Sequence, residues 1–195
     1  MKKLFLHIGT HKTGTTAIQI FLNENKKHLS NLGLEYPDIG NTETYPYNNH
    51  NIAWELSEDK RFHKKYKTLS HLYDFMKNNK KNIILSSEDF QIINFNQNNF
   101  KEFKNIIKQN NYSLIIILFL RNQIDYFCGI YQIMLMLGIP FVSPEELSRN
   151  LLNNDYIQVD QVHYWFNYHK KIQQIKNVFN ISNENIICKS YDENK

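Results

Sequence analysis

The sequence has little cysteine, no long apolar run and no dense cluster of charge. Its two cysteines, Cys128 and Cys188, are far apart and lack metal-ligand spacing, which argues against both a disulfide framework and a zinc site. Such a chain suits a reducing compartment, and we expect a cytoplasmic protein that needs no metal. The longest apolar run, Leu114 to Leu120, is far shorter than the ~20 residues that span a bilayer, so no membrane segment is expected.

An export signal and a nucleic-acid footprint are also missing. The N-terminal Met1-Lys2-Lys3 is basic, but the apolar segment behind it ends at Leu6, too early for the core of a signal peptide. The net charge of +4 fits an anionic ligand, yet it falls short of the dense lysine and arginine stripe of nucleic-acid-binding proteins. We therefore expect no nucleic-acid partner.

What the sequence does have is the composition of one soluble globular domain. Its 195 residues fit a single domain, because one hydrophobic core is comfortable up to ~250 residues. Hydrophobic residues at 42% and charged residues at 22% are ordinary for such a domain. Aromatic residues, at 14%, are frequent enough to exclude a disordered chain.

Apolar runs alternate with amphipathic stretches, and this order predicts an α/β fold with a central parallel sheet. Strands are expected at 4–6, 83–87, 114–120 and 186–191, and helices at 17–22, 51–56, 66–78, 100–110, 125–137, 159–179 and from Pro144 onward, with Ser143 as its N-cap. In the first helix the apolar residues 17, 18, 21 and 22 share one face. Residues 36–50 are predicted to form a long loop suited to substrate binding.

The stretch from His7 to Thr16, between the first strand and the first helix, carries the clearest chemical signal. Gly9 and Gly14 enclose four residues, as in a Walker A loop, but Thr15 stands where that pattern requires lysine. The lysine lies inside the loop instead, at Lys12. A glycine loop at a helix N-terminus gathers backbone N–H groups around one point and suits a phosphate or sulfate group. The displaced lysine argues against a magnesium-dependent kinase or other phosphotransferase, which stays as an alternative.

The string His11-Lys12-Thr13-Gly14-Thr15-Thr16 resembles the 5′-phosphosulfate-binding loop of sulfotransferases that use 3′-phosphoadenosine 5′-phosphosulfate (PAPS). The resemblance implies a three-layer α/β/α, P-loop-like fold with PAPS as the sulfuryl donor. It makes this whole string the cofactor-binding loop. Lys12 would bridge the 5′-phosphate and the sulfuryl group, while Gly14, Thr15 and Thr16 would donate hydrogen bonds to the 5′-phosphate.

A second stretch, Leu118 to Tyr126, resembles the family's next signature, in which an arginine at a strand end binds the 3′-phosphate of the cofactor. The resemblance gives this role to Arg121, whose forked guanidinium matches a phosphate. The family commonly has a serine eight residues later, where this chain has Gly129. Residues 185–193 resemble the family's late strand, after which further helices and a basic loop normally follow. We therefore expect one sulfotransferase-like domain over 1–195, truncated at its C-terminus relative to the family.

Sulfuryl transfer also needs a base, and two residues qualify. Glu88 follows a strand end near the loop, and His50 precedes a helix beside the predicted substrate loop. Related sulfotransferases use either residue type, and the string from Asn49 to Trp54 resembles bacterial members, so both candidates stay open. His7, His163 and His169 are interpreted as packing residues, and the basic run 60–67 as a solvated surface.

The resemblance as a whole implies in-line transfer of a sulfuryl group from PAPS to a hydroxyl or amine of a carbohydrate or other small metabolite. Positioning and electrostatics would carry most of the catalysis. Gly129 and the end of the chain at Lys195 favour a second hypothesis, a truncated relative that binds the nucleotide without turnover. The acceptor cannot be named from sequence.

Overall fold

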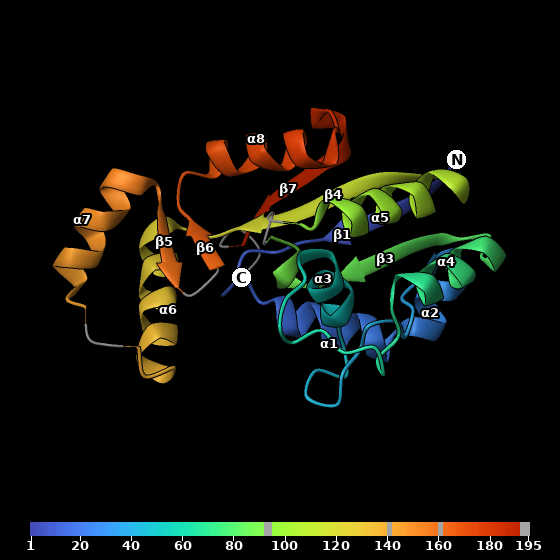
Figure 1. The fold of residues 1–195 in the computed structure, drawn as a ribbon, viewed down its shortest axis with the longest axis horizontal. Coiled ribbons are helices and arrows are strands. Elements are labelled where there is room, and N and C mark those ends of the chain that lie inside the picture. The colour runs from blue at the N-terminus through green and yellow to red at the C-terminus, as the bar shows by residue number, and fades with distance from the viewer. Residues whose placement is uncertain (92–94, 140–141, 160–161, 192–195) are drawn as a thin grey trace.

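A parallel sheet of five strands forms the centre of the molecule, seen in a computed structural model that describes residues 1–91, 95–139, 142–159 and 162–191 (Figure 1). The strand order is β2-β3-β1-β4-β7, so the first strand of the chain lies in the middle. The strands are β1 (Lys2–His7), β2 (Leu34–Glu35), β3 (Asn82–Ser86), β4 (Tyr112–Leu120) and β7 (Ile186–Ser190). All four pairings are parallel. The predicted α/β fold is therefore confirmed.

Both faces of the sheet are buried, which explains why its strands are nearly continuous apolar runs. In β1, Leu4 and Leu6 face one apolar cluster and Phe5 faces another. β1 pairs with both neighbours in register, Leu4 opposite Ile83 of β3 and opposite Leu114 of β4. Because side chains alternate across a strand, each face receives every second residue.

Helices cover the two faces and complete a three-layer α/β/α arrangement. The larger cluster packs one face against α3 (His50–Ser57), α4 (Leu69–Asn78), α5 (Gln97–Gln109) and α8 (Tyr168–Phe179). The smaller cluster packs the opposite face against α1 (Thr15–Glu24) and α2 (Lys26–Asn31). Two short 3₁₀ turns, η1 (Glu88–Gln91) and η2 (Asn183–Asn185), connect elements at the sheet ends.

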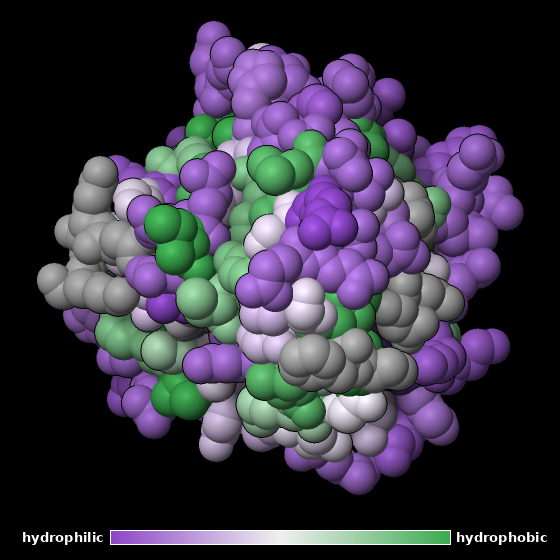
Figure 2. Space-filling model, turned by 90° about the vertical axis from the view of Figure 1, so that its left-hand side faces the viewer, coloured by the Kyte–Doolittle hydropathy of each residue, from purple (hydrophilic) through white to green (hydrophobic). Residues whose placement is uncertain are grey.

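A third apolar cluster lies at the left of Figure 1, away from the sheet. It joins α6 (Gln123–Met136), α7 (Pro144–Asn154) and a hairpin of β5 (Tyr156–Val159) and β6 (Val162–Trp165). Figure 2 views this end, where apolar patches lie among polar ones. Met136 of α6 and Leu152 of α7 are both exposed. Within the described ranges, no helix has the length and apolar character needed to cross a bilayer.

The predicted helix over 159–179 is wrong in its first half, which is the β5–β6 hairpin. In β5, Ile157 and Val159 are buried while Gln158 is exposed, so the apolar residues follow the two-residue period of a strand. The helix α8 begins only at Tyr168, because the Asn167 side chain accepts a hydrogen bond from the Lys170 N–H and caps it. The Ser143 cap of α7 is confirmed by the same type of bond, from the Glu146 N–H.

The apolar face predicted for the first helix is only partly buried. The buried residues of α1 are Thr15, Gln19 and Leu22, whereas Phe21 is 57% exposed. Two polar side chains displace apolar ones from the inner face because this helix begins at the anion loop. Its inner face therefore serves the site described below rather than the core.

Candidate anion-binding and catalytic site

The loop between β1 and α1 turns sharply at three residues with positive φ. These angles are 31° at Gly9, 63° at Lys12 and 71° at Gly14. A side chain at Gly14 would place its Cβ 3.0 Å from the Tyr191 ring, so glycine is needed both for the angle and for this contact. Thr13 stabilises the turn, since its hydroxyl donates to the Thr10 carbonyl at 2.5 Å.

A cavity of about 420 Å³ opens at this loop and is lined by several of the residues that the sequence singled out. Its walls come from the loop, from the first turn of α1, from η1 and from α6: His11, Lys12, Gly14, Thr15, Thr16, Glu88 and Ile133. The start of α1 brings its free backbone N–H groups and its positive dipole end to the same place. The arrangement suits an anion held beside a carboxylate. The buried Thr13 does not line the cavity.

Arg121 lies beside the loop but does not line the cavity. Its Nη1 donates to the Lys12 carbonyl at 3.0 Å, and its guanidinium lies 5.5 Å from the centre of the Tyr191 ring. Its Nε is buried and makes no hydrogen bond with the described residues. Gly129 faces the same pair: a Cβ there would be 3.0 Å from Lys12 Cγ and 3.7 Å from Arg121 Nη1. Lysine, arginine and glycine thus pack as one unit.

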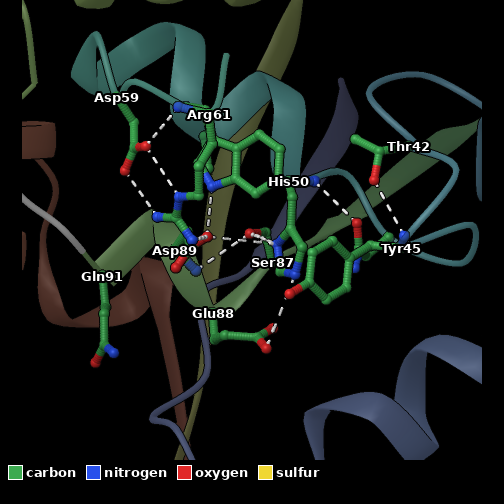
Figure 3. Close-up of polar contacts among 12 residues, drawn as sticks. Thr42, Tyr45, His50, Asp59, Arg61, Ser87, Glu88, Asp89 and Gln91 are labelled. Carbon is green, nitrogen blue, oxygen red and sulfur yellow. Dashed lines mark hydrogen bonds and ion pairs between the residues drawn. The ribbon is translucent and has the colours of Figure 1, made fainter. Parts of the chain in front are cut away.

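The two candidate bases, His50 and Glu88, lie next to each other (Figure 3), and of the two only Glu88 lines the cavity. His50 Nε2 lies 3.9 Å from Glu88 Oε1, and the other ring nitrogen, Nδ1, is 2.6 Å from Ser87 Oγ. Glu88 Oε2 accepts a hydrogen bond from Gln19 Nε2 at 3.1 Å. Burial lowers the pKa of His50, although the carboxylates of Glu88 and Asp89 oppose this shift. His50 is therefore neutral near pH 7.

The predicted substrate loop is fastened to the end of β3 by Asn49. Its Oδ1 accepts from the Ser86 N–H at 2.7 Å, and its Nδ2 donates to the Ile39 carbonyl at 2.7 Å. These bonds fix the first turn of α3 and with it the position of His50. Tyr45 of the loop, 45% exposed, meets the His50 ring edge-on at 5.0 Å. The loop therefore reaches the candidate base.

Three residues beside His50 were not predicted from the sequence. Trp54 Nε1 donates to Asp89 Oδ2 at 2.6 Å, and Arg61 Nη1 lies 3.2 Å from the same oxygen (Figure 3). The Arg61 guanidinium also lies 4.7 Å from the centre of the Trp54 ring. Arg61 belongs to the run interpreted as solvated surface, and it is exposed as predicted, although it also pairs with Asp59 and Asp89. The sequence did carry a signal for Asp89, because it directly follows Glu88 at the end of a predicted strand.

The other histidines differ in their surroundings. His7 Nδ1 is 2.7 Å from Ser86 Oγ, and burial lowers the pKa of His7 to about 4, which fits the predicted packing role. His163 stacks on Tyr156 at 4.4 Å, within the hairpin and not on a helix. His11 lines the cavity, and its ring meets Tyr164 of β6 edge-on at 5.1 Å.

Comparisons with known proteins show a likeness in fold. No family model matches the chain, and no curated protein matches its sequence. Among solved structures, the crystal structure of a sulfotransferase from Alicyclobacillus acidocaldarius aligns with a TM-score of 0.53 and 14% sequence identity, covering 99% of this chain and 74% of that one. The chain therefore has a sulfotransferase-like α/β fold with a central parallel sheet.

Proposed function

We propose that this protein is a PAPS-dependent sulfotransferase that acts on a hydroxyl or amine of a carbohydrate or other small metabolite. The observation that carries the proposal is the cavity at the first strand–helix loop, where Lys12 and the helix start face the carboxylate of Glu88. Such a site pairs an anion-binding loop with a base, the two parts that sulfuryl transfer to an acceptor requires. The fold shared with a sulfotransferase supports it.

The loop residues would hold the donor. Thr15, Thr16 and the backbone at Gly14 would donate to the 5′-phosphate, and Lys12 would neutralise charge on the phosphate as it leaves. Arg121 would bind the 3′-phosphate after exchanging its bond to the Lys12 carbonyl for the ligand. His11 would add a further donor, and Thr13 would shape the loop through its bond to Thr10.

The positions of His50 and Glu88 support a different role for each. A separation of 3.9 Å between Nε2 and Oε1 admits one acceptor oxygen at ~2.8 Å from both atoms. Glu88 lines the cavity, whereas the His50 side chain is only 5% exposed. Glu88 therefore removes the acceptor proton and His50 orients the acceptor. The acceptor oxygen or nitrogen forms a bond to sulfur while the bond from sulfur to the 5′-phosphate oxygen breaks, and the electron pair leaves with 3′-phosphoadenosine 5′-phosphate (PAP).

Binding of PAP tests the donor site. A ligand specific for the folded state stabilises it by ~2.7 kcal/mol at a hundredfold excess over its dissociation constant, which a thermal-shift assay detects. We expect PAP to stabilise the wild type and to stabilise Lys12→Ala much less, with the exposed Lys27→Ala as the matched control. If PAP does not stabilise the folded protein but ATP with Mg²⁺ does, the proposed function is a phosphotransferase instead.

Turnover of PAPS with a broad acceptor panel tests the base. We expect Glu88→Gln to lower the rate ~10²–10⁴-fold, the usual contribution of general base catalysis, while PAP binding persists. Glu24→Gln, at the exposed end of α1, is the control. His50→Gln should retain more activity than Glu88→Gln, and the reverse order would transfer the role of base to His50.

A non-catalytic nucleotide-binding protein is the second candidate. The observation that favours it is the engagement of Arg121 with the Lys12 backbone, together with Gly129 where the resemblance calls for serine. PAP binding with no sulfated product from any acceptor would support this candidate over the enzyme.

A further inference from the structure

A lysine is buried in the first turn of α8, on the face that packs against the sheet. Lys171 is 1% exposed, and its Nζ donates to the Gln91 carbonyl at 2.7 Å. Burial lowers the pKa of Lys171 to about 7. A buried ammonium costs free energy that an apolar side chain would not, so a role outside packing is worth seeking. Its partner is the last residue of η1, the turn that also carries Glu88.

Gln91 connects this lysine to the anion loop. It is 3% exposed, and its side-chain Nε2 contacts His11 Nδ1. Tyr164 of β6 meets the same imidazole from another side. Two segments far apart in the chain, η1 and β6, therefore contact the ring of His11, a residue that lines the cavity with Lys12.

The contact between the Gln91 amide and His11 Nδ1 bears on which nitrogen of the His11 ring carries the proton. Burial lowers the pKa of His11, although Glu88 and Asp89 oppose the shift, so the ring is neutral. A neutral imidazole has one donor nitrogen and one acceptor nitrogen. A side-chain amide nitrogen can only donate, so this contact fits a His11 ring with Nδ1 as the acceptor and the proton on Nε2.

We propose that Gln91 and Lys171 are positioning residues that hold His11 so that its Nε2–H donates a hydrogen bond to the anion in the cavity. The inference rests on the proposed function for the identity of that anion. Lys171 fixes the backbone of Gln91, Gln91 fixes the tautomer and orientation of His11, and His11 touches the ligand. A change in α8 thereby reaches the binding loop through two hydrogen bonds.

Histidine ¹⁵N NMR on the ligand-free protein tests the tautomer without relying on any nucleotide. The wild type should show the His11 proton on Nε2. Gln91→Glu, whose carboxylate only accepts, should move it to Nδ1. Gln109→Glu, at the exposed C-terminal end of α5, adds the same charge elsewhere and should leave His11 unchanged. A wild-type proton on Nδ1, or no change in Gln91→Glu, would overturn the inference.

Calorimetric titration with PAP measures the consequence for binding. Gln91→Met removes the donor without changing charge, and we expect its affinity to fall roughly tenfold, as loss of a hydrogen bond to a charged group implies. Lys171→Met should show mixed His11 tautomers and a smaller loss. Unchanged affinity and a single tautomer in both variants would refute the positioning role. If PAP fails to bind the wild type, the proposed function falls, and the NMR comparison alone decides the role of Gln91 and Lys171.

Discussion

At the scale of single residues, Gly129 is where the family resemblance and the structure lead to opposite expectations. The resemblance calls for a serine that binds the 3′-phosphate. In the structure, a Cβ at this position would lie 3.0 Å from Lys12 Cγ and 3.3 Å from its Cβ. Any side chain here would therefore displace the stem of Lys12, which lines the cavity.

We expect Gly129→Ser to weaken PAP binding. Displacing the packed lysine should cost about 1 kcal/mol, roughly a fivefold rise in the dissociation constant. Isothermal titration calorimetry measures this change, with Cys128→Ser, an exposed neighbour on the same helix, as the control. Tighter binding would mean that the serine contacts the phosphate as in the resemblance and that Lys12 accommodates it.

The sequence predicted loop residues better than their neighbours in space. Gly9, Lys12 and Gly14 form a local pattern whose spacing is visible in the chain. Arg61 lies in a run of surface lysines after α3, and it lies 3.2 Å from Asp89 of η1, a residue far along the chain. Nothing in the spacing of these two residues signals their contact. A contact that depends on tertiary packing cannot be predicted from the local sequence around either residue.

At the scale of elements, α8 combines an amphipathic helix with one buried cation, and this combination has a measurable pH dependence. The pKa of Lys171 is about 7 in the folded protein and ~10.4 in an unfolded chain. Between these values the unfolded state binds more protons than the folded state. The free energy of unfolding should therefore rise with pH from about 7 toward 10, by up to a few kcal/mol.

The comparison of wild type with Lys171→Met isolates this contribution from other groups that titrate at high pH. Urea unfolding at several pH values should show Lys171→Met more stable than wild type near pH 7, with the difference shrinking as pH rises. Lys77→Met, on the exposed side of α4, should follow the wild type. A constant difference across this range would show that Lys171 is not neutralised in the folded protein.

The bounds of helices and strands were predicted well where the apolar residues fit only one spacing, that of a helix or that of a strand. The strands β3 and β4 and the helices α5 and α6 lie close to the predicted ranges. The β5–β6 hairpin was mistaken for helix because Val162, Trp165 and Phe166 fit a helical face equally well. Two short strands that pack on α6 and α7 depend on partners that periodicity does not reveal.

At the scale of the whole molecule, the alternation of strands and helices was sufficient to predict the α/β class and the edge of the sheet where the candidate site residues lie. The carboxyl ends of β1, β3 and β4 bring together the anion loop, Glu88 and Arg121. The contacts that distinguish this site, from α8 through η1 to His11, cross long stretches of chain. They follow from the packing of layers and not from any motif.

The central place of β1 also has a consequence for how the chain is made. Its partners are β3 and β4, and Lys2 pairs with Tyr112, so a ribosome must synthesise more than half of the chain before β1 has a neighbour on each side. β3 can pair with β1 earlier, but the other side of this apolar strand stays unpaired until β4 is made, and long-range pairings of this type form slowly. The nascent chain therefore passes through an aggregation-prone interval in which chaperones would determine the yield of folded protein.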